Sequence, residues 1–275
     1  MISTYDKMFE LIKSHKYDSF EKLLQTNIDI NVRDTSYNTL IYYTILYNNT
    51  KLTKKLISMG ARLDILDNNG RTLLYNPIQF GYNEIIKILI GQEYIGIPLL
   101  ELSDNEGYFP IHYSIFFNNI FALNYIIKNS DNINLETKDR ENSLFLAVRN
   151  ENIDICKILL ENKISVNSYN KNKDTPLHIA CEMEYVDIIK LLLEYKADVN
   201  IKNDYELTPL FISIISNNNN MFEIIMKYNV NIELQDTNGN TVFHYSIQNS
   251  NIYSFEECYK KLKNKHIINE SNITG

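Results

Sequence analysis

The amino-acid sequence predicts an all-α solenoid of about eight helix-turn-helix units whose connections form β-turn or hairpin tips. A Thr-Pro pair opens a unit at Thr175-Pro176 and again 33 residues later at Thr208-Pro209, and Thr241 follows after another 33 residues. The apolar second half of each unit repeats at the same period, and turn-forming Asp, Asn and Gly stand between the units. Self-similarity at a period of roughly 20–50 residues is the signature of a stacked-repeat architecture.

The repeat can be followed through the whole sequence. Backward from Thr175, steps of 33 residues reach Asn142 and Phe109, one step of 37 reaches Thr72, and two more steps of 33 reach Thr39 and Asp6. We therefore predict a single array over residues 1–275. Its units are 1–33, 34–66, 67–103, 104–136, 137–169, 170–202, 203–235 and 236–265, followed by a tail at 266–275. The first and last units carry more polar residues and are expected to cap the array, because each has only one neighbour to bury its apolar stripe.

Local signals predict where the helices begin. A Thr before an apolar run accepts an otherwise unbonded backbone N–H, and proline suits the first helical position because it has no N–H to satisfy. Between the two helices of each unit the chain needs a left-handed residue, which glycine adopts best and asparagine tolerates. This position holds Asn48, Gly81, Asn118, Glu151, Glu184, Asn217 and Ser250. Glu151 and Glu184 suit it least.

The hairpins and the third unit show departures from the pattern. Asp67-Asn68-Asn69-Gly70 is typical of the turns, but four units lack the glycine and are expected to have less regular hairpins. The residues near that place are Tyr37 or Asn38, Arg140, Lys173 and Glu206. In the third unit, Pro77 is expected to kink the first helix. The four-residue insertion falls at 91–101, where we expect a loop that folds over the fourth unit or contacts a partner.

The Thr-Pro-Leu-His element at Thr175–His178 and the 33-residue period resemble the ankyrin-repeat family over essentially the whole sequence. The resemblance implies an ankyrin-repeat solenoid that binds another protein and does not catalyse a reaction. It also implies that partners lie on the concave side, formed by turn tips and the exposed ends of first helices. The resemblance further implies that the histidines at the last position of this element bond to the backbone of the neighbouring turn. These histidines are His112, His178 and His244.

Composition narrows the function classes further. The net charge of −7 and the pI of about 5.3 argue against nucleic acid and against an anionic membrane surface as partners. The N-terminus lacks the pattern of a signal peptide, no run of apolar residues is long enough to span a membrane, and the three cysteines are far apart. We therefore expect a cytoplasmic protein, in the host cell if it comes from a virus or a bacterium.

No residues predict catalysis, a metal site or a cofactor. The three recurrent histidines are two units apart, or roughly 20 Å if adjacent helices pack about 10 Å apart, which is too far to share a metal ion. Cys156, Cys181 and Cys258 fall at core positions without a base beside them. We expect no enzyme activity, since the repeats leave no segment for a catalytic domain.

The predicted binding surface comprises exposed positions of the first helices and hairpin tips. We hypothesise that an aromatic cluster in units 2–4 grips an apolar segment of a partner and that later units add a charged rim. The candidate residues are Tyr47, Phe80, Tyr108, Phe116, Phe117, Arg149, Met183 and Tyr205. The alternative is that some of these aromatic side chains turn into the packing between units.

The function predicted from sequence is a protein–protein interaction module, monomeric on its own, that acts as an adaptor or inhibitor. Heavy use of Asn, Ile and Lys resembles ankyrin proteins of large DNA viruses, which suggests a host protein as the partner. The alternatives are a self-associating structural scaffold, an ankyrin effector of an intracellular bacterium, and an enzyme or toxin with an ankyrin appendage.

Overall fold

A computed structural model describes residues 3–26, 28–91 and 99–262, which belong to two compact units, Met1–Thr137 and Lys138–Gly275. The described residues form sixteen α-helices and one short 3-10 helix, and they contain no β-strand. An isolated antiparallel bridge joins Arg33 to Thr39. The predicted all-α fold of about eight helix-turn-helix units is therefore confirmed, whereas the repeat boundaries stay predictions.

The helices follow one another in pairs. The first unit contains α1 (Thr4–Lys13), α2 (Tyr17–Leu23), α3 (Leu40–Leu46), α4 (Thr50–Ser58), α5 (Tyr75–Phe80), α6 (Asn83–Ile90), the 3-10 helix η1 (Leu99–Glu101), α7 (Pro110–Phe116) and α8 (Ile120–Asn129). The second unit contains α9 (Ser143–Arg149), α10 (Ile153–Glu161), α11 (Pro176–Glu182), α12 (Val186–Glu194), α13 (Pro209–Ile215), α14 (Asn219–Met226), α15 (Val242–Gln248) and α16 (Ile252–Lys261).

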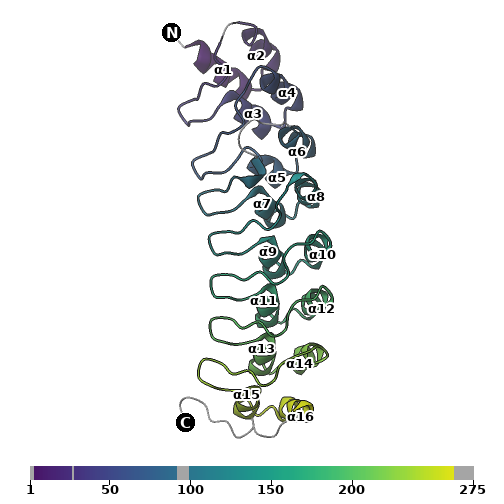
Figure 1. Cartoon of the computed structure of the whole chain (residues 1–275). Coiled ribbons are helices and arrows are strands. Elements are labelled where there is room, and N and C mark those ends of the chain that lie inside the picture. Colours follow the sequence, from purple (N-terminus) through teal and green to yellow (C-terminus); the bar gives the residue numbers. More distant parts are fainter. Residues whose placement is uncertain (1–2, 27, 92–98, 263–275) are drawn as a thin grey trace. The chain divides into compact units, whose positions relative to one another are not determined.

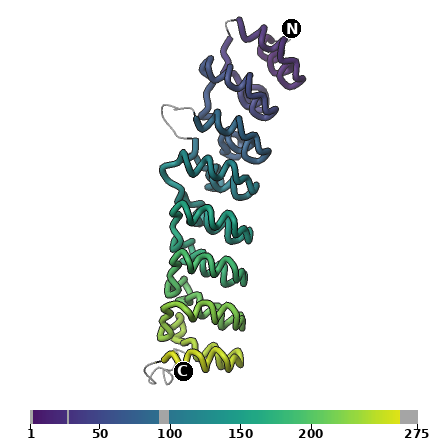
Figure 2. The backbone as a smooth tube through the Cα atoms, turned by 90° about the vertical axis from the view of Figure 1, so that its right-hand side faces the viewer, coloured from purple at the N-terminus to yellow at the C-terminus, as the bar shows by residue number. Residues whose placement is uncertain are grey.

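Within each unit the helices form two layers (Figure 1). The first helix of each pair packs on the first helix of the next pair, as α3 does on α5, and the second helices pack in the same way, as α4 does on α6. Long loops project from the layer of first helices, on the side away from the second helices (Figure 1). The regular stacking of pairs is also visible from the side in Figure 2. The core lies between the layers, where side chains such as Phe20, Ile45 and Phe211 are almost fully buried.

Polar side chains fix both helix starts in a repeat. At the start of α11, the Thr175 hydroxyl accepts the N–H of His178, and the His178 Nδ1 accepts the N–H of Thr175 at 3.1 Å. The second helices begin differently, because an asparagine oxygen accepts the N–H three residues later. This cap is made by Asn49, Asn119, Asn152, Asn218 and Asn251, at 2.9–3.0 Å. An asparagine thus satisfies a backbone N–H at the start of five described second helices, whereas α2, α6 and α12 have no side-chain cap.

The residue between the two helices is left-handed in every described pair. Glu151 and Glu184 adopt φ values of 52° and 57°, close to the 52° of Asn48 and the 55° of Asn217. The prediction of a left-handed residue at this place is therefore confirmed. Because a side chain carries a steric cost of about 1–2 kcal/mol in this conformation, the two glutamates are strained by the fold that surrounds them.

Pro77 does not kink α5, and the sequence-based expectation was wrong. Helices α3 and α7 each begin one residue after the cap, at Leu40 and Pro110. Helix α5 begins at Tyr75, which is three residues after Thr72 and so two residues later. Pro77 therefore lies in the first turn, where its nitrogen needs no partner. Thr72 accepts the N–H of Leu74 at 3.3 Å in the turn before the helix, and α5 itself has no side-chain cap.

The insertion is only partly described. Residues 92–98 lie outside the described residues, as does the tail at 266–275. The segment that follows forms η1, in which Leu99 and Leu100 are buried, and η1 packs against α7. The proposed contact of the 91–101 loop with a partner therefore stays a prediction.

Buried polar side chains connect successive repeats. In the first unit, His112 lies close enough for its Nε2 to donate to the backbone carbonyl of Leu135 at 3.2 Å; in the second unit, His178 does the same with Leu207 at 3.1 Å. Burial lowers the pKa of His112 to about 4, so its ring is neutral near pH 7 and can accept on one nitrogen and donate on the other. The link implied by the ankyrin resemblance is therefore present at these two histidines.

The strain at Glu151 leads to a stability prediction. We expect Glu151→Gly to stabilise the chain by about 1 kcal/mol, because glycine adopts positive φ without the steric cost of a Cβ. The matched substitution Glu161→Gly, at the right-handed end of α10, should destabilise it. Guanidinium unfolding of both variants would measure the difference. Equal destabilisation by the two substitutions would show that the left-handed position is not strained.

Candidate functional site

The loops between repeats are hairpins, and most of them are organised by their first side chain. The hairpins comprise residues 34–39 (second repeat), 67–72 (third), 104–109 (fourth), 137–142 (fifth), 170–175 (sixth), 203–208 (seventh) and 236–241 (eighth). In six of them the first residue is Asp or Asn, and its Oδ1 accepts the N–H groups two and four residues later, at 2.7–3.1 Å. The side chain thus replaces the backbone partners that a turn leaves unsatisfied.

Hairpins without glycine are as regular as those with it, so the sequence-based expectation of irregular hairpins was wrong. In all four of these hairpins the residue at the glycine position has a φ value of 58–63°, the same left-handed region as Gly70 at 76°; these residues are Tyr37, Arg140, Lys173 and Glu206. The first side chain holds the turn strongly enough to impose this conformation on a bulky residue. The backbone of the hairpins is therefore nearly constant, and their side chains differ.

An acidic first residue also ties its hairpin to the helix that follows. Asp34 accepts bonds from the Tyr43 hydroxyl and from the Lys13 ammonium group, both at 2.7 Å. Burial disfavours its charge, but these donors together with two backbone N–H groups outweigh burial and lower the pKa of Asp34 to about 2. Tyr113 donates to Asp104 and Tyr245 donates to Asp236 in the same way.

Five aromatic side chains of the first unit form a continuous cluster, which we call the aromatic cluster: Tyr75, Tyr108, Tyr113, Phe116 and Phe117. Tyr108 lies edge-on to Phe116, with ring centroids 5.1 Å apart, and Tyr75 lies edge-on to Tyr113 at 4.8 Å. The cluster spans the third and fourth repeats and includes three of the predicted site residues. Tyr75 and Tyr113 were missed, because they occupy positions that read as core in the sequence.

The exposure of the cluster is uneven. Phe116 is 44% exposed, whereas Phe117 is more buried and packs on Tyr75 and Tyr113. Phe117 therefore belongs in part to the packing between repeats. Phe116, with Tyr108 behind it, presents an apolar surface to solvent.

The other two aromatic candidates of the first unit, Phe80 and Tyr47, contact described aromatic rings outside the aromatic cluster. Phe80 is 52% exposed and stacks on Tyr82, with ring centroids 5.6 Å apart. Tyr47 packs edge-on against His15 of the preceding repeat at 4.6 Å and stacks on Tyr43. Tyr47 thus follows the alternative reading, in which an aromatic side chain turns into the packing between repeats.

The candidates of the second unit lie in a charged environment. Arg149 donates to Glu141 at 2.6 Å, and this bond raises the pKa of the guanidinium group further. On the neighbouring repeat, burial raises the pKa of Glu182, and the nearby charge of Asp174 adds to the effect. Met183 is exposed beside Glu182. Surface ion pairs of this kind contribute little to stability, so their charges are available to orient a partner.

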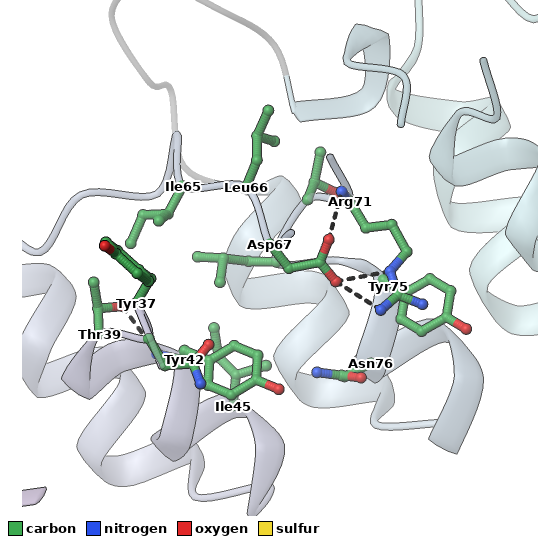
Figure 3. A pocket seen from close by; sticks show the side chains of 13 residues that line it. Tyr37, Thr39, Tyr42, Ile45, Ile65, Leu66, Asp67, Arg71, Tyr75 and Asn76 are labelled. Carbon is green, nitrogen blue, oxygen red and sulfur yellow. Dashed lines mark hydrogen bonds and ion pairs between the residues drawn. The ribbon is translucent and has the colours of Figure 1, made fainter. Parts of the chain in front are cut away.

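Tyr205 and a groove complete the candidate surface. Tyr205 is 67% exposed at the tip of the seventh hairpin. In the first unit, a groove of about 570 Å³ lies between the second and third hairpins. Figure 3 shows the smaller hollow beside it, with Tyr37 and Tyr42 on one side and Asp67 and Arg71 on the other. In the sequence Tyr37 stands out only as a substitute for glycine, and no pattern there predicts this groove.

The described residues offer no obvious reactive group. They contain no cluster of three or more His, Cys, Asp or Glu side chains that could hold a metal ion. Burial raises the pKa values of the Cys156 and Cys258 thiols to about 12, so thiolate is scarce at neutral pH. Among the residues described, no helix is sufficiently long and apolar to cross a bilayer.

The bonds to Asp34 lead to a pH prediction. Because its folded pKa of about 2 lies below the ordinary 3.8, its ionised form adds stability above pH 4 that is lost as the pH falls toward 2. Asp34→Asn should keep the turn bonds, as Asn170 and Asn203 do, but lose roughly 1–2 kcal/mol at pH 7. Unfolding curves from pH 7 to pH 3 should show this loss shrinking below pH 4. The control Asp18→Asn, on the exposed side of α2, should show no comparable loss. A pH-independent loss at position 34 would contradict the role of the charge.

Comparisons with known proteins agree with the geometry. The family model described as ankyrin repeats (3 copies) matches residues 8–98, 111–203 and 196–272. Ankyrin repeat protein L371 of Acanthamoeba polyphaga mimivirus is 39% identical over 159 residues, which is 56% of this chain and 21% of that protein. The chicken nuclear factor NF-kappa-B p105 subunit is 28% identical over 46% of this chain and 13% of its own length.

A fowlpox virus ankyrin repeat protein, FPV034, is 26% identical over 50% of this chain and 32% of that protein. The chain thus matches a third or less of the length of these relatives. The crystal structure of the ankyrin repeat domain of Bcl-3, a member of the IkappaB protein family, superposes with a TM-score of 0.73 over 80% of this chain and 97% of that domain, at 17% identity. The repeated hairpins, the paired helices and the sequence matches over most of its length show that this chain belongs to the ankyrin-repeat family.

Proposed function

We propose that this chain binds a segment of a partner protein through the first-helix and hairpin side of its first unit, and that its cellular role is to redirect or inhibit a host protein. Ankyrin repeats are protein–protein interaction modules, so binding of a protein follows from the family. The host-directed part is supported by the matching proteins of mimivirus and fowlpox virus. On this proposal the chain works in the cytoplasm of the host cell.

The observation that carries the proposal is the exposed edge of the aromatic cluster. Phe116 remains 44% exposed although Tyr108 and Tyr113 lie beside it, and Phe80 is 52% exposed. Water contact with large apolar side chains is unfavourable, and aromatic anchors dominate the energetics of protein interfaces. A partner that covered these rings would gain from their burial, and the backbone beneath them is already fixed by helices.

The charged residues of the second unit would determine which partner binds more than how tightly it binds. Arg149, paired with Glu141, and the acidic Glu182 give this unit a mixed but ordered charge pattern. Such charges steer association and disfavour partners of the wrong sign. Met183 and Tyr205 offer exposed apolar contacts in the same unit.

Affinity capture with a double variant tests the proposal. The purified chain, incubated with a lysate of Acanthamoeba cells, should enrich specific proteins that mass spectrometry identifies, and Phe80→Ala/Phe116→Ala should lose them. Phe117 is left unchanged because it packs on Tyr75 and Tyr113, so its removal would disturb the fold. Two exposed aromatic contacts of about 1–2 kcal/mol each correspond to a loss of roughly tenfold to several hundredfold in affinity.

The control double variant Ile252→Ala/Tyr259→Ala removes equally exposed apolar side chains from α16, in the layer of second helices. It should capture the same proteins as the unchanged chain. Circular dichroism must show equal helix content in all three. Capture that survives the loss of Phe80 and Phe116 would sink the proposal. Light scattering on the purified chain should give a monomer, and a dimer that depends on Phe116 would favour the self-associating scaffold instead.

A further inference from the structure

Tip-to-tip hydrogen bonds join neighbouring hairpins. In each such bond, the N–H of the second residue of one hairpin donates to the carbonyl of the third residue of the hairpin before it. The pairs are Asn105 to Asn69 at 2.9 Å, Lys171 to Asp139 at 3.0 Å, Asp204 to Asn172 at 2.9 Å, and Thr237 to Tyr205 at 3.3 Å. Among adjacent described hairpins within a unit, one pair departs from this pattern. The N–H of Asn68 and the carbonyl of Ser36, which would join the second and third hairpins, make no such bond within the described part of the chain.

The side chains explain part of this gap. The third and fourth hairpins meet closely because Gly70 has no Cβ, and a Cβ there would lie 2.5 Å from the Oδ1 of Asn105. The second hairpin has Tyr37 at the corresponding position and faces another asparagine, Asn68. The Asn-on-Gly contact is therefore sterically excluded between the second and third hairpins. A Cβ alone does not prevent the tip bond, since the sixth hairpin carries Lys173 and keeps its bond to the seventh.

The open pair of hairpins borders the groove of about 570 Å³. In a lining that is otherwise mostly polar, Tyr37 at the hairpin tip is 69% exposed and Leu66, just before the third hairpin, is 41% exposed. Tyr42 extends this surface toward the first helix, and Figure 3 shows Tyr37 and Tyr42 on the same side of the hollow. Exposed apolar side chains beside a groove are typical of a binding site, because an apolar side chain of a bound partner would cover them.

The charge of the groove indicates the sign of its occupant. Arg71 is neutralised, since its guanidinium group binds Asp67 at 2.7 Å and lies over the ring of Tyr75. Arg33 also lines the groove and is exposed; its charge helps to lower the pKa of Asp64, but no salt bridge joins it to a described residue. An incoming carboxylate would therefore meet an available cation at one side of the groove.

We propose that the groove between the second and third hairpins binds an extended peptide segment of a partner protein that carries a large apolar residue next to an acidic one. The peptide backbone would bond to the Asn68 N–H and the Ser36 carbonyl and so fill the place of the missing tip bond. The apolar side chain packs on Tyr37 and Leu66, and the carboxylate pairs with Arg33. This inference rests on the proposed function, because it names the class of partner segment that the first unit selects.

Selection from a phage-displayed library of random 12-residue peptides against the full chain tests the inference. The enriched peptides should share an aromatic or large aliphatic residue beside Asp or Glu. Adding a synthetic peptide of the enriched sequence should shift the amide NMR signals of Ser36 and Asn68 and slow exchange of the Asn68 N–H. Enrichment of basic peptides, or the absence of any enriched sequence, would overturn the inference.

Two substitutions of the groove complete the test. Arg33→Glu should weaken binding of the enriched peptide at least tenfold, and Tyr37→Gly should do the same. Tyr37→Gly keeps loss of binding distinct from unfolding, because glycine adopts the positive φ of 63° at this position without strain. Lys54→Glu on the exposed face of α4 is the charge control, and Glu206→Gly, at the same hairpin position in the other unit, is the backbone control.

The controls should bind as tightly as the unchanged chain. The outcome also separates this inference from the proposed function. If peptide binding is lost in Phe80→Ala/Phe116→Ala but retained in Tyr37→Gly and Arg33→Glu, the aromatic cluster is the binding surface and the groove proposal is wrong. If the groove variants alone lose binding, the groove is the peptide site.

Discussion

The rest of the structure depends on one side-chain oxygen of the Asp or Asn that begins most of the hairpins. In six of the hairpins it accepts two backbone N–H groups that the turn would otherwise leave unbonded. This bond pair is strong enough to hold Tyr37 and Lys173 in the left-handed conformation that glycine adopts elsewhere. The hairpins therefore share nearly the same backbone conformation. As a result, a His side chain can bond to the following hairpin at a similar distance in different repeats, and successive helix pairs stack in the same way.

Because the backbone of the hairpins is nearly constant, the choice of binding partner must depend on the side chains. In the first unit the hairpins and first helices carry aromatic residues, of which Phe116 and Tyr37 remain well exposed. In the second unit two of the positions that correspond to Phe116 carry Arg149 and Glu182, with Arg149 bonded to Glu141. The same scaffold thus presents two chemically different surfaces, the first suited to anchoring a partner and the second to discriminating among partners. The groove beside Tyr37 arises where one tip-to-tip bond of the scaffold is not made.

The periodic part of this architecture could be predicted from sequence, because the 33-residue step, the Thr caps and the left-handed position are local signals. Other features depend on atoms far apart in sequence. Pro77 was predicted to kink a helix, but the helix starts later and places it in the first turn. Phe117 and Tyr47 looked exposed from their phase, yet each turns onto an aromatic ring of the preceding repeat. The groove could not be predicted, since it reflects whether one tip meets the next.

Residue-resolved amide hydrogen exchange on the full chain tests the central claim most directly. This claim is that the first Asp or Asn side chain holds its hairpin and that, within each unit, adjacent tips are joined except between the second and third hairpins. The account predicts slow exchange at Asn38 and Leu207, which bond to that side chain in hairpins without glycine, and at Asn105, which makes a tip bond. It predicts fast exchange at Asn68. Rapid exchange at Asn38 and Leu207, or an Asn68 amide as protected as that of Asn105, would contradict it.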